Sequence, residues 1–330
     1  GTNGKTTVTL LLEHILTFAG LSAQALGNVG VPLAKHLPKL SQEAIVCAEL
    51  SSYQLETMRK NSLDCGVILN ITPDHLDRYK GMKEYASVKA RVGLMIKPEG
   101  KLFVEEACYQ HFGDLLPKDK IERYGYDWAL DCATDLEYLY RHQQKVGELP
   151  SVLQGKKSHD LENFMAAYLM ADYFQVPYEI IRKAYGYFEK PHHRIELISE
   201  VNGVRFYDDS KGTNIDAVIR AVETMQGPTI LIAGGVHKGS SYTPWIEPFH
   251  GKVKKIFAIG EAAPIIHDEL SARIPVKICS TLKEAVEESY KLAEKGDAVL
   301  LSPGCSSFDM FRDYAHRGEE FVRIVKGVPK

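Results

Sequence analysis

The sequence predicts an α/β protein built from two units, each a mostly parallel β-sheet covered by helices. Short apolar runs alternate with helix-like segments along most of the 330 residues, which is typical of parallel sheets with helices on both faces. Several of these runs, such as residues 44–50, are nearly continuous in apolar residues, as in strands buried on both faces. The chain is also long enough for two separate cores.

The first half of the chain contains three expected strands and three expected helices. The strands are residues 44–50, 65–72 and 101–106, and the helices are residues 6–21, 82–96 and 158–174. The last helix carries apolar residues at helical spacing and is expected to close the first unit. Residues 127–154 fit either short antiparallel strands or an appended turn-rich piece, and both alternatives stay open.

The second half begins where Pro191 interrupts the helical pattern, because proline breaks a helix. We therefore expect a domain boundary between residues 190 and 191. Thr281 and Glu284 have the spacing of a capping box at a helix start. Strands are expected at residues 203–210, 228–235, 254–260, 276–280 and 297–304, with helices between them.

Composition excludes several classes of partner and location. The formal net charge of −3 gives no electrostatic reason to expect a nucleic acid or an acidic membrane. No apolar run approaches the roughly 18 residues of a membrane span, and no signal peptide precedes the first motif. The six cysteines are scattered without a CxxC pair, which indicates small core residues in a reducing compartment. We expect a cytoplasmic location.

Residues 1–7, GTNGKTT, resemble the second half of a phosphate-binding loop. In such a loop, backbone N–H groups and the following helix N-terminus surround phosphate oxygens. Gly4, Lys5 and Thr6 supply the GK[ST] part, in which the lysine reaches the outer phosphates and the hydroxyl binds magnesium. The upstream glycine of the pattern would lie before Gly1. A plain loop is the alternative.

Polar residues follow two expected strands, at the sheet edge where open α/β sheets bind ligands. Glu49 ends the first of these strands and could hold a magnesium ion, or could cap the next helix beside Ser51 and Ser52. Asp74, His75 and Asp77 follow the next strand and could bind a cation or phosphate, or form a simple turn. Lys89, on the helix that follows, would face solvent by pattern alone.

The second half has comparable polar turns. Arg194 could bind a phosphate, and the turn at residues 208–213 combines acids, a base and hydroxyls in a way that suits substrate handling. A helix cap by Asp209 or Ser210 is the alternative for that turn. Residues 233–239 and 302–318 also follow apolar strands, and could bind a carboxylate through backbone amides and Lys238.

Taken together, these segments resemble the Mur ligase family of ATP-dependent amide-forming enzymes in peptidoglycan precursor synthesis. GTNGKTT, GNVG, ELSSYQLE, NITPDHLDRY, PHHRIE, DDSKGTN and LSPGCSSFDMF occur in the family's order across nearly the whole chain. ELSSYQLE most resembles the members that add D-glutamate to UDP-N-acetylmuramoyl-L-alanine. The resemblance implies a P-loop NTPase-like ATP-binding domain at residues 1–190 and a Rossmann-like domain that binds D-glutamate at residues 191–330.

The resemblance also assigns roles to matching residues. It implies ATP and two magnesium ions as cofactors, with Lys89 carbamylated by carbon dioxide. Catalysis would depend on Lys5, Glu49, His75 and Lys89, and the metal ligands would be Thr6, Glu49, His75 and carbamylated Lys89. The nucleotide would be bound by Gly1, Thr2, Asn3, Gly4, Lys5, Thr6, Thr7, Asn163, Arg194 and Asp209. The other substrates would be bound by Asn28, Lys211, Thr213, Lys238, Ser307 and Tyr314.

Some positions depart from the family pattern. Asp160 stands where asparagine is common, His237 precedes Lys238 where aspartate or glycine is common, and Tyr314 replaces a frequent phenylalanine. These differences affect the contacts to adenine and D-glutamate. Family members have a UDP-binding domain before the ATPase domain, so we expect this chain, which starts at the loop, to be a monomeric fragment that does not ligate alone. A different P-loop enzyme, such as a kinase or folylpolyglutamate synthase, and a non-catalytic nucleotide-binding fragment are the alternatives.

Overall fold

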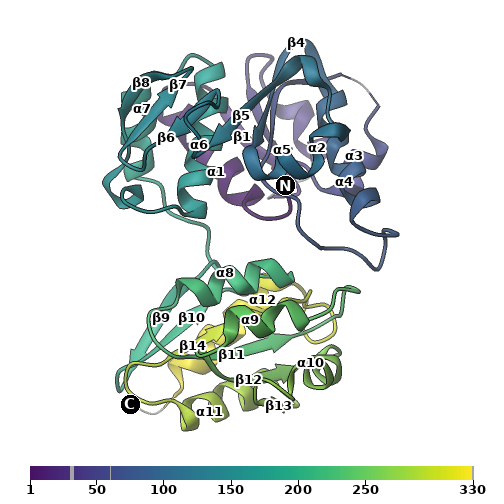
Figure 1. Ribbon diagram of the computed structural model, residues 1–330, viewed down its shortest axis with the longest axis vertical. Helices are drawn as coiled ribbons and strands as arrows, with labels where there is room; N and C mark the ends of the chain where they lie inside the picture. Colours follow the sequence, from purple (N-terminus) through teal and green to yellow (C-terminus); the bar gives the residue numbers. More distant parts are fainter. Residues whose placement is uncertain (30–32, 60, 329–330) are drawn as a thin grey trace. The chain divides into compact units, whose positions relative to one another are not determined.

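The computed structural model describes residues 1–29, 33–59 and 61–328 and divides into two compact units. The first comprises Gly1–Thr72 and Gly81–Lys190, and the second comprises Pro73–Lys80 and Pro191–Lys330. Both units are α/β, as predicted (Figure 1). Residues 73–80 belong to the second unit although the flanking sequence belongs to the first.

A six-stranded sheet, ordered β3-β4-β5-β6-β7-β8, lies at the centre of the first unit. Its parallel strands are β3 (Leu63–Ile68), β4 (Ile96–Glu105), β5 (Ile121–Gly125) and β6 (Cys132–Thr134). β7 (Tyr138–Arg141) and β8 (Gln144–Glu148) extend it antiparallel. Of the two alternatives for residues 127–154, short antiparallel strands is therefore the correct one.

A separate sheet of two parallel strands, β1 (Ala23–Gly27) and β2 (Ile45–Glu49), completes the strands of this unit. β2 and β3 coincide with two of the expected strands, but β3 ends at Ile68, two residues before Asn70. β4 starts five residues earlier than expected.

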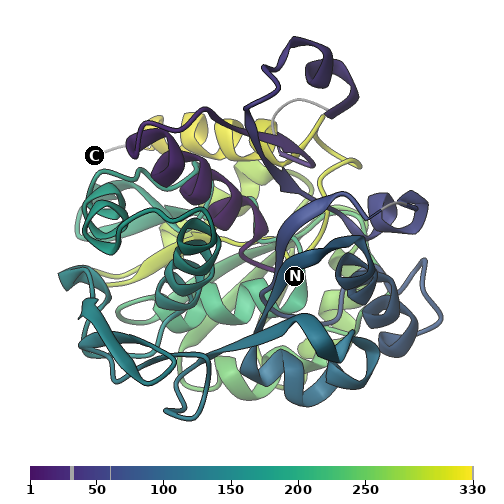
Figure 2. The same ribbon diagram turned by 90° about the horizontal axis from the view of Figure 1, so that it is seen from above.

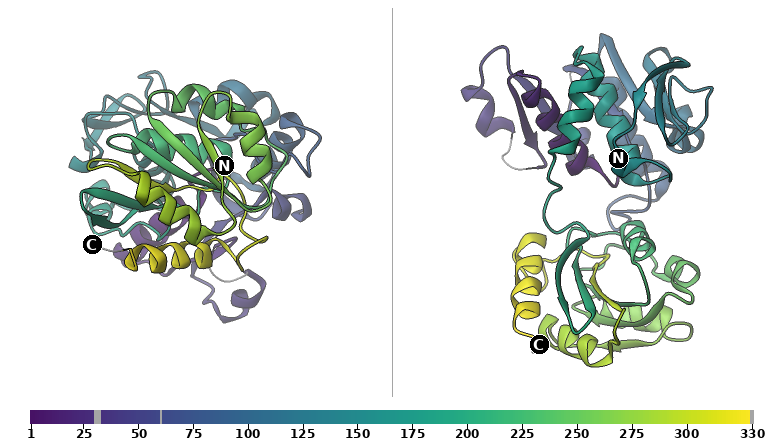
Figure 3. Two further views of the ribbon diagram at one scale, coloured as in Figure 1. Left: turned by 90° about the horizontal axis from the view of Figure 1, so that it is seen from below. Right: turned by 90° about the vertical axis from the view of Figure 1, so that its left-hand side faces the viewer.

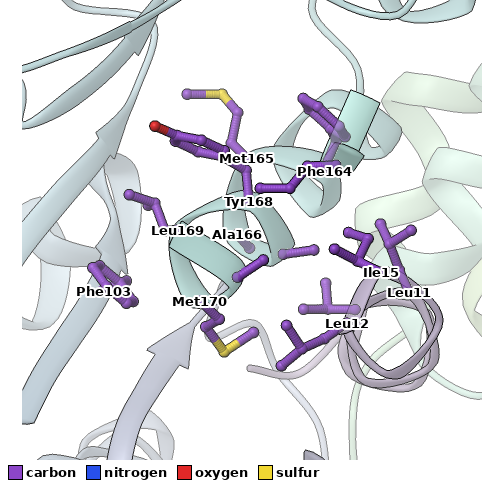
Figure 4. Packing of buried hydrophobic residues seen from close by; sticks show 14 of the residues in the cluster. Leu11, Leu12, Ile15, Phe103, Phe164, Met165, Ala166, Tyr168, Leu169 and Met170 are labelled. Atoms are coloured by element: carbon purple, nitrogen blue, oxygen red, sulfur yellow. The ribbon is translucent and has the colours of Figure 1, made fainter. Parts of the chain in front are cut away.

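The core of the first unit forms between helices α1 (Lys5–Phe18), α6 (His159–Tyr173) and α7 (Tyr178–Gly186) and the six-stranded sheet. α1 and α6 lie side by side (Figure 2), and Leu11 and Ile15 of α1 belong to the same buried cluster as Phe164 of α6 (Figure 4). The expectation that α6 closes the unit is wrong, because α7 follows it and also packs into this core.

Shorter helices complete the first unit. They are α2 (Leu33–His36), α3 (Ser52–Thr57), α4 (Met82–Ala90) and α5 (Glu106–Phe112). The single helix expected at residues 82–96 is wrong in its second half. α4 ends at Ala90, a 3₁₀ segment continues over Arg91–Met95, and Ile96 already belongs to β4.

The second unit contains a six-stranded sheet in the order β13-β12-β11-β14-β10-β9. The strands are β9 (Glu196–Val201), β10 (Val204–Asp208), β11 (Thr229–Gly234), β12 (Val253–Ile259), β13 (Val276–Ile278) and β14 (Ala298–Leu301). All pairs are parallel except β9 with β10. Asn202 and Gly203, both with positive φ, form the two-residue turn of that hairpin, as the strand twist requires.

Helices cover both faces of this sheet (Figure 3, right). Leu231 and Ala233 of β11 pack with α8 (Ile215–Thr224), α9 (Ile246–Phe249) and α10 (Ala263–Leu270). Ile230 and Ile232 point the other way and pack with α11 (Leu282–Leu292) and α12 (Tyr314–Lys326). Strands that bury both faces explain the nearly continuous apolar runs in the sequence.

Thr281 caps α11 through the N–H of Glu284, while the Glu284 carboxylate accepts from the N–H of Ser280 and not of Thr281, so the capping box is only half formed. Over the described residues, the helices are too short or too polar to cross a bilayer.

Candidate functional site

The loop of residues 1–4 is anchored at the carboxyl end of β3. The backbone N–H of Thr2 donates to the carbonyl oxygen of Asn70 at 2.7 Å, and the N–H of Asn3 donates to Oδ1 of Asn70 at 2.8 Å. Gly4 then turns the chain into α1 (14 residues) with a φ of 84°, and as a glycine it supplies no side-chain cap. A glycine turn at the start of a helix is the arrangement by which a phosphate-binding loop presents backbone N–H groups to an anion.

Three side chains follow this turn. Lys5 folds back over the loop and donates from Nζ to the carbonyl oxygen of Thr2 at 2.7 Å. Thr6 and Thr7 are buried in the first turn of α1. Asn163, from α6, lies directly against the loop, since a Cβ on Gly4 would collide with its side-chain oxygen. Helix α6 therefore brings Asn163, which is expected to bind the nucleotide, to the phosphate loop.

Glu49 lies at the carboxyl end of β2 and is only 4% exposed. Its Oε1 accepts a hydrogen bond from Nδ2 of Asn28 at 2.9 Å, whereas its Oε2 is buried with no hydrogen-bond partner. The alternative that Glu49 caps the next helix is wrong, because Ser51 and Gln54 form a complete capping box on α3. An unpartnered buried carboxylate oxygen is costly, so this atom suits a cation.

Lys89 is 5% exposed, so the pattern that would leave it facing solvent is misleading. Its Nζ donates to the carbonyl oxygen of Gly1 at 2.9 Å and lies 4.7 Å from the centre of the Tyr85 ring. Gly1, Lys5, Glu49 and Lys89 all line one cavity of about 530 Å³ in the first unit. Four of the residues predicted to act on ATP in this unit therefore line one cavity.

His75, the remaining predicted metal ligand, lies in the second unit and adopts a positive φ of 55°. Among the residues that the structure describes, no group of three or more His, Cys, Asp and Glu side chains is arranged to hold a metal. A metal in the first unit would depend on Glu49, the Thr6 hydroxyl and a modified Lys89. The predicted four-residue ligand set stays a prediction.

Lys238 of the second unit binds a carboxylate within its own unit. Its Nζ donates to Oδ1 of Asp74 at 2.5 Å, and that oxygen also accepts from the backbone N–H of His75 at 3.0 Å. Both Lys238 and Asp74 are largely buried, with side-chain exposures of 13% and 10%. The ion pair shows that this lysine can bind a carboxylate in a nearly dry setting.

The loop after β10 carries two buried aspartates with different surroundings. Oδ2 of Asp208 contacts Nδ1 of His193 at 2.7 Å, and this hydrogen bond raises the pKa of the imidazole. Asp209 accepts from the Ser302 hydroxyl at 2.6 Å. Burial raises the pKa of Asp209 to about 7, although the charge of Arg194 acts in the opposite direction. Arg194 and Asp209, predicted to bind one nucleotide, are therefore electrostatically coupled.

The predicted D-glutamate residues gather at the carboxyl ends of β10, β11 and β14. Lys211 Nζ donates to the Tyr314 hydroxyl at 3.0 Å. The backbone N–H of Val236 donates to the carbonyl oxygen of Ser306 at 2.9 Å, which joins the loops that carry Lys238 and buried Ser307. Thr213 lies half-buried on the loop after β10. In the same loop, the carbonyl oxygen of Gly212 accepts a hydrogen bond from the N–H of Gly304 at 2.8 Å.

Sequence reasoning missed three residues that hold these loops. Asn70 anchors Thr2 and Asn3, and its place at the end of an apolar strand was the available signal. Arg317 is fully buried on α12 and donates to the carbonyl oxygens of Ser210 and Cys305 at 2.8 and 3.2 Å. His193 makes its bond to Asp208 across the β9–β10 hairpin, and no local pattern marks either of these long-range pairs.

Comparison with protein families gives two matches that together cover most of the chain. Residues 1–171 match the Mur ligase middle domain, and residues 193–305 match the Mur ligase glutamate ligase domain. The boundary between the matches falls close to Pro191.

Individual relatives agree with these matches. The chain is 52% identical over 326 residues to a UDP-N-acetylmuramoylalanine--D-glutamate ligase of Protochlamydia amoebophila (strain UWE25), covering 99% of this chain and 73% of the relative. It is 37% identical over 339 residues to the ligase of that name from Caldicellulosiruptor saccharolyticus, covering 98% and 74%. The structure resembles crystal structure I of MurF from Acinetobacter baumannii with a TM-score of 0.74 at 19% identity, covering 98% and 75%, which supports the fold alone.

Proposed function

The chain belongs to the Mur ligase family, and we propose that it is an ATP-dependent ligase that joins D-glutamate to UDP-N-acetylmuramoyl-L-alanine. The observation that carries this proposal is the cavity of the first unit. It places Lys5, Glu49 and Lys89 around the phosphate loop in a chain that is 52% identical to a D-glutamate ligase. The product amide belongs to cytoplasmic peptidoglycan precursor synthesis.

The reaction we propose has two steps. The terminal alanine carboxylate attacks the γ-phosphorus of ATP, the bond to ADP breaks, and an acyl phosphate forms. The D-glutamate ammonium loses a proton, and the free amine attacks the acyl carbon. The nitrogen then loses a second proton as inorganic phosphate leaves and the carbonyl is restored. Both steps crowd anionic oxygens together, so positioned positive charge is the main catalytic need.

The phosphate loop meets part of that need from this chain's own atoms. The glycine turn at Gly4 and the N-terminus of α1 would offer backbone N–H groups to the phosphates, and Lys5, whose Nζ lies over the loop, would reach the outer phosphates. Asn163 would approach the nucleotide from α6. Arg194 and Asp209 would bind its phosphates and ribose from the second unit.

Magnesium fits the first unit because Oε2 of Glu49 is buried and unpartnered, and carboxylate and hydroxyl oxygens are the ligands that this ion prefers. Glu49, the Thr6 hydroxyl, carbamylated Lys89 and His75 would hold two such ions. When bound, magnesium supplies positive charge to the phosphate oxygens. Asn28 would orient Glu49 through the hydrogen bond from its Nδ2 and approach the muramoyl substrate.

Carbamylation of Lys89 fits its surroundings. Two lysine side chains, Lys5 and Lys89, line the same cavity. Once the Lys89 ammonium has lost a proton, addition of carbon dioxide to Nζ and loss of a second proton would replace a cation by an anion that can support magnesium.

The second unit would bind D-glutamate. Lys238 would bind one carboxylate, as it binds that of Asp74 in this structure. Thr213, Ser307, Lys211 and Tyr314 would supply hydroxyl, ammonium and backbone donors around the other. A dianionic amino acid suits the two lysines of this set. The six cysteines, all free thiols, are consistent with a reducing cytoplasm, and we propose that the protein acts as a monomer.

The test measures phosphate release from ATP by this chain joined to the segment that the Protochlamydia relative carries outside the match. UDP-N-acetylmuramoyl-L-alanine is supplied with D-glutamate, L-glutamate or meso-diaminopimelate. Phosphate release with D-glutamate, but not with L-glutamate or meso-diaminopimelate, supports the proposal. Equal release with another amino acid, or no release with any of them, overturns it. A Lys5→Ala variant should be inactive, and normal turnover by it would remove the assignment of the phosphate loop.

A further inference from the structure

Arg194 lies between two residues with left-handed backbone. His193 has a φ of 63° and Ile195 has a φ of 48°, and all three residues belong to the second unit. This conformation is uncommon outside glycine, and for a β-branched residue such as isoleucine it is an outlier that the surrounding structure must hold in place. Strained backbone of this kind clusters at ligand-binding sites. Its position on both sides of one arginine indicates that the direction of that arginine matters.

The backbone on each side of Arg194 is tied to the loop after β10. The carbonyl oxygen of His193 accepts a hydrogen bond from the N–H of Lys211 at 3.1 Å. The N–H of Ile195 donates to the carboxylate of Asp209. The Ile195 side chain also packs against the buried cluster that the sheet forms with α8, α9 and α10. These contacts hold the segment but leave the His193 side chain to be fixed separately.

The imidazole of His193 is fixed by Asp208, the last residue of β10. Nδ1 of His193 donates to Oδ2 of Asp208 at 2.7 Å, and the two side chains are only 15% and 0% exposed. Oδ1 of Asp208 accepts from the N–H of Ser210 at 2.8 Å, which holds the carboxylate in turn. The hydrogen bond with Asp208 raises the pKa of the imidazole, and the charges of Glu196 and Glu319 act in the same direction. The surroundings therefore favour a charged, hydrogen-bonded pair.

Helix α12 closes over this pair through Gly318. A Cβ on Gly318 would lie 2.2 Å from Nδ1 of His193 and 2.7 Å from Oδ2 of Asp208. A residue with a side chain would therefore push the imidazole away from the carboxylate. Tyr314, one turn earlier on α12, meets the imidazole edge-on, with ring centroids 6.3 Å apart. The imidazole is thus held between β10 and α12.

Stability alone explains this arrangement poorly. The cost of burying two charges can exceed the attraction between them. Left-handed backbone at His193 and Ile195 adds a further cost. Both costs fall on the residues next to Arg194, which is the pattern of a site that gives up stability for a fixed geometry.

We propose that Asp208 and His193 are positioning residues for the nucleotide: their buried pair holds the left-handed backbone before Arg194 and thereby fixes the direction in which the arginine extends. The inference rests on the proposed function only in that Arg194 contacts a nucleotide phosphate. An arginine that is already directed loses less conformational entropy when the phosphate binds. The pair thus contributes to ATP affinity through Arg194 and not through a contact of its own.

The experiment is a double-mutant cycle on the completed enzyme, the chain joined to the segment that its relatives carry outside the match. The variants are Asp208→Ala, Arg194→Ala and the two combined. Calorimetry gives the Kd for ATP, and turnover gives KM for ATP and kcat separately. Asp208→Asn is the conservative variant, because asparagine keeps an acceptor for Ser210 and can donate from Nδ2 to a neutral imidazole.

Gly318→Ala provides a second route to the same test, since the added Cβ displaces the imidazole but removes neither partner of the bond. It carries the cycle with Arg194→Ala if Asp208→Ala does not fold. Gly186→Ala is the matched control, at a glycine of α7 where a Cβ meets open space.

We expect Asp208→Ala and Gly318→Ala each to raise the Kd and KM for ATP by about tenfold, as for the loss of one charge-assisted contact, with a smaller effect on kcat. Asp208→Asn should restore most of the affinity, and Gly186→Ala should leave it unchanged. In the Arg194→Ala background, Asp208→Ala and Gly318→Ala should weaken ATP binding no further.

Full additivity of the Asp208 and Arg194 effects would overturn the proposal, because the pair would then act without the arginine. An unchanged Kd for ATP in Asp208→Ala or Gly318→Ala would also overturn it. Calorimetry with ATP needs no amino acid, so a chain that binds ATP but ligates another amino acid refutes the proposed function and leaves this inference standing. A completed enzyme that binds no ATP refutes both.

Discussion

The ammonium of Lys89 donates a hydrogen bond to the carbonyl oxygen of Gly1 at 2.9 Å, which joins helix α4 to the phosphate loop. The two residues are 88 positions apart, and no local pattern relates them. The bond buries a lysine that the polar composition of α4 would leave in solvent, and it places the lysine nitrogen at the edge of the cavity that holds Glu49.

The first prediction concerns this lysine. Lys89→Ala should abolish ligation in the completed enzyme, and formate or acetate should partly restore it, because a small carboxylate can occupy the place of the carbamate. Lys83→Ala, at an exposed lysine of the same helix, is the matched control and should keep its activity. Incubation with ¹³C-labelled carbon dioxide should give a carbamate signal that Lys89→Ala lacks. Absence of rescue and of this signal would count against carbamylation.

A second prediction follows from the unpartnered oxygen of Glu49. Glu49→Gln keeps an oxygen for the hydrogen bond from Asn28 but removes the charge that a cation would meet. We expect binding of magnesium–ATP to weaken by about tenfold or more, since hydrogen bonds and contacts to charged groups contribute about 1.5–3 kcal/mol. Binding of ATP without magnesium should change little.

Titration calorimetry with and without magnesium measures both quantities. Glu43→Gln, at an exposed position just before β2, serves as the control and should behave as the unchanged chain. Equal weakening of ATP binding in the presence and absence of magnesium would show that Glu49 does not act through a cation.

A third prediction separates backbone strain from collision at Gly4. Gly4 and Gly20 share a φ of 84°, but a Cβ on Gly4 would collide with Asn163 and Leu69, whereas a Cβ on Gly20 meets open space. Gly20→Ala should therefore cost only the left-handed strain of about 1–2 kcal/mol. Gly4→Ala should cost more and lower the thermal midpoint further in scanning calorimetry. Equal midpoints for the two variants would show that Asn163 does not constrain the loop.

Much of the fold could be predicted from sequence because its signals are local. Apolar runs identified β10 to β14 of the second unit, apart from their exact ends, but not β9, and helical periodicity identified α1 and α6. The grouping of residues 73–80 with the second unit could not be predicted, since it depends on contacts such as that between Asp74 and Lys238, 164 positions apart.

The candidate site, like the fold, contains residues that the sequence could predict and residues that it could not. The phosphate loop and Glu49 lie at the ends of predicted strands, so motif and strand position together pointed to them. Asn70, His193 and Arg317 act through backbone atoms or distant partners, and such roles leave no spacing signal. The burial of Lys89 also escaped prediction, because a single lysine near the end of a polar helix usually extends into water.

The last prediction concerns pH and Asp209. Burial raises the pKa of Asp209 from 3.8 to about 7, so between these values the folded state holds a proton that the unfolded chain has released. Stability from this group therefore falls as pH rises through that window and is lowest above it. Asp209→Asn removes the titrating carboxyl, and an asparagine can still accept the hydrogen bond from Ser302.

We therefore expect Asp209→Asn to be less stable or equal at about pH 4 and more stable than the unchanged chain at about pH 8, because only the unchanged chain must bury a charge there. Denaturant unfolding of the second unit can be followed through the fluorescence of Trp245, which is fully buried in it. Asp268→Asn, at a carboxylate 81% exposed, is the control and should not alter the pH dependence. If the difference between Asp209→Asn and the unchanged chain is the same at both pH values, Asp209 is charged throughout, and its carboxylate is free to meet the ribose hydroxyls without first losing a proton.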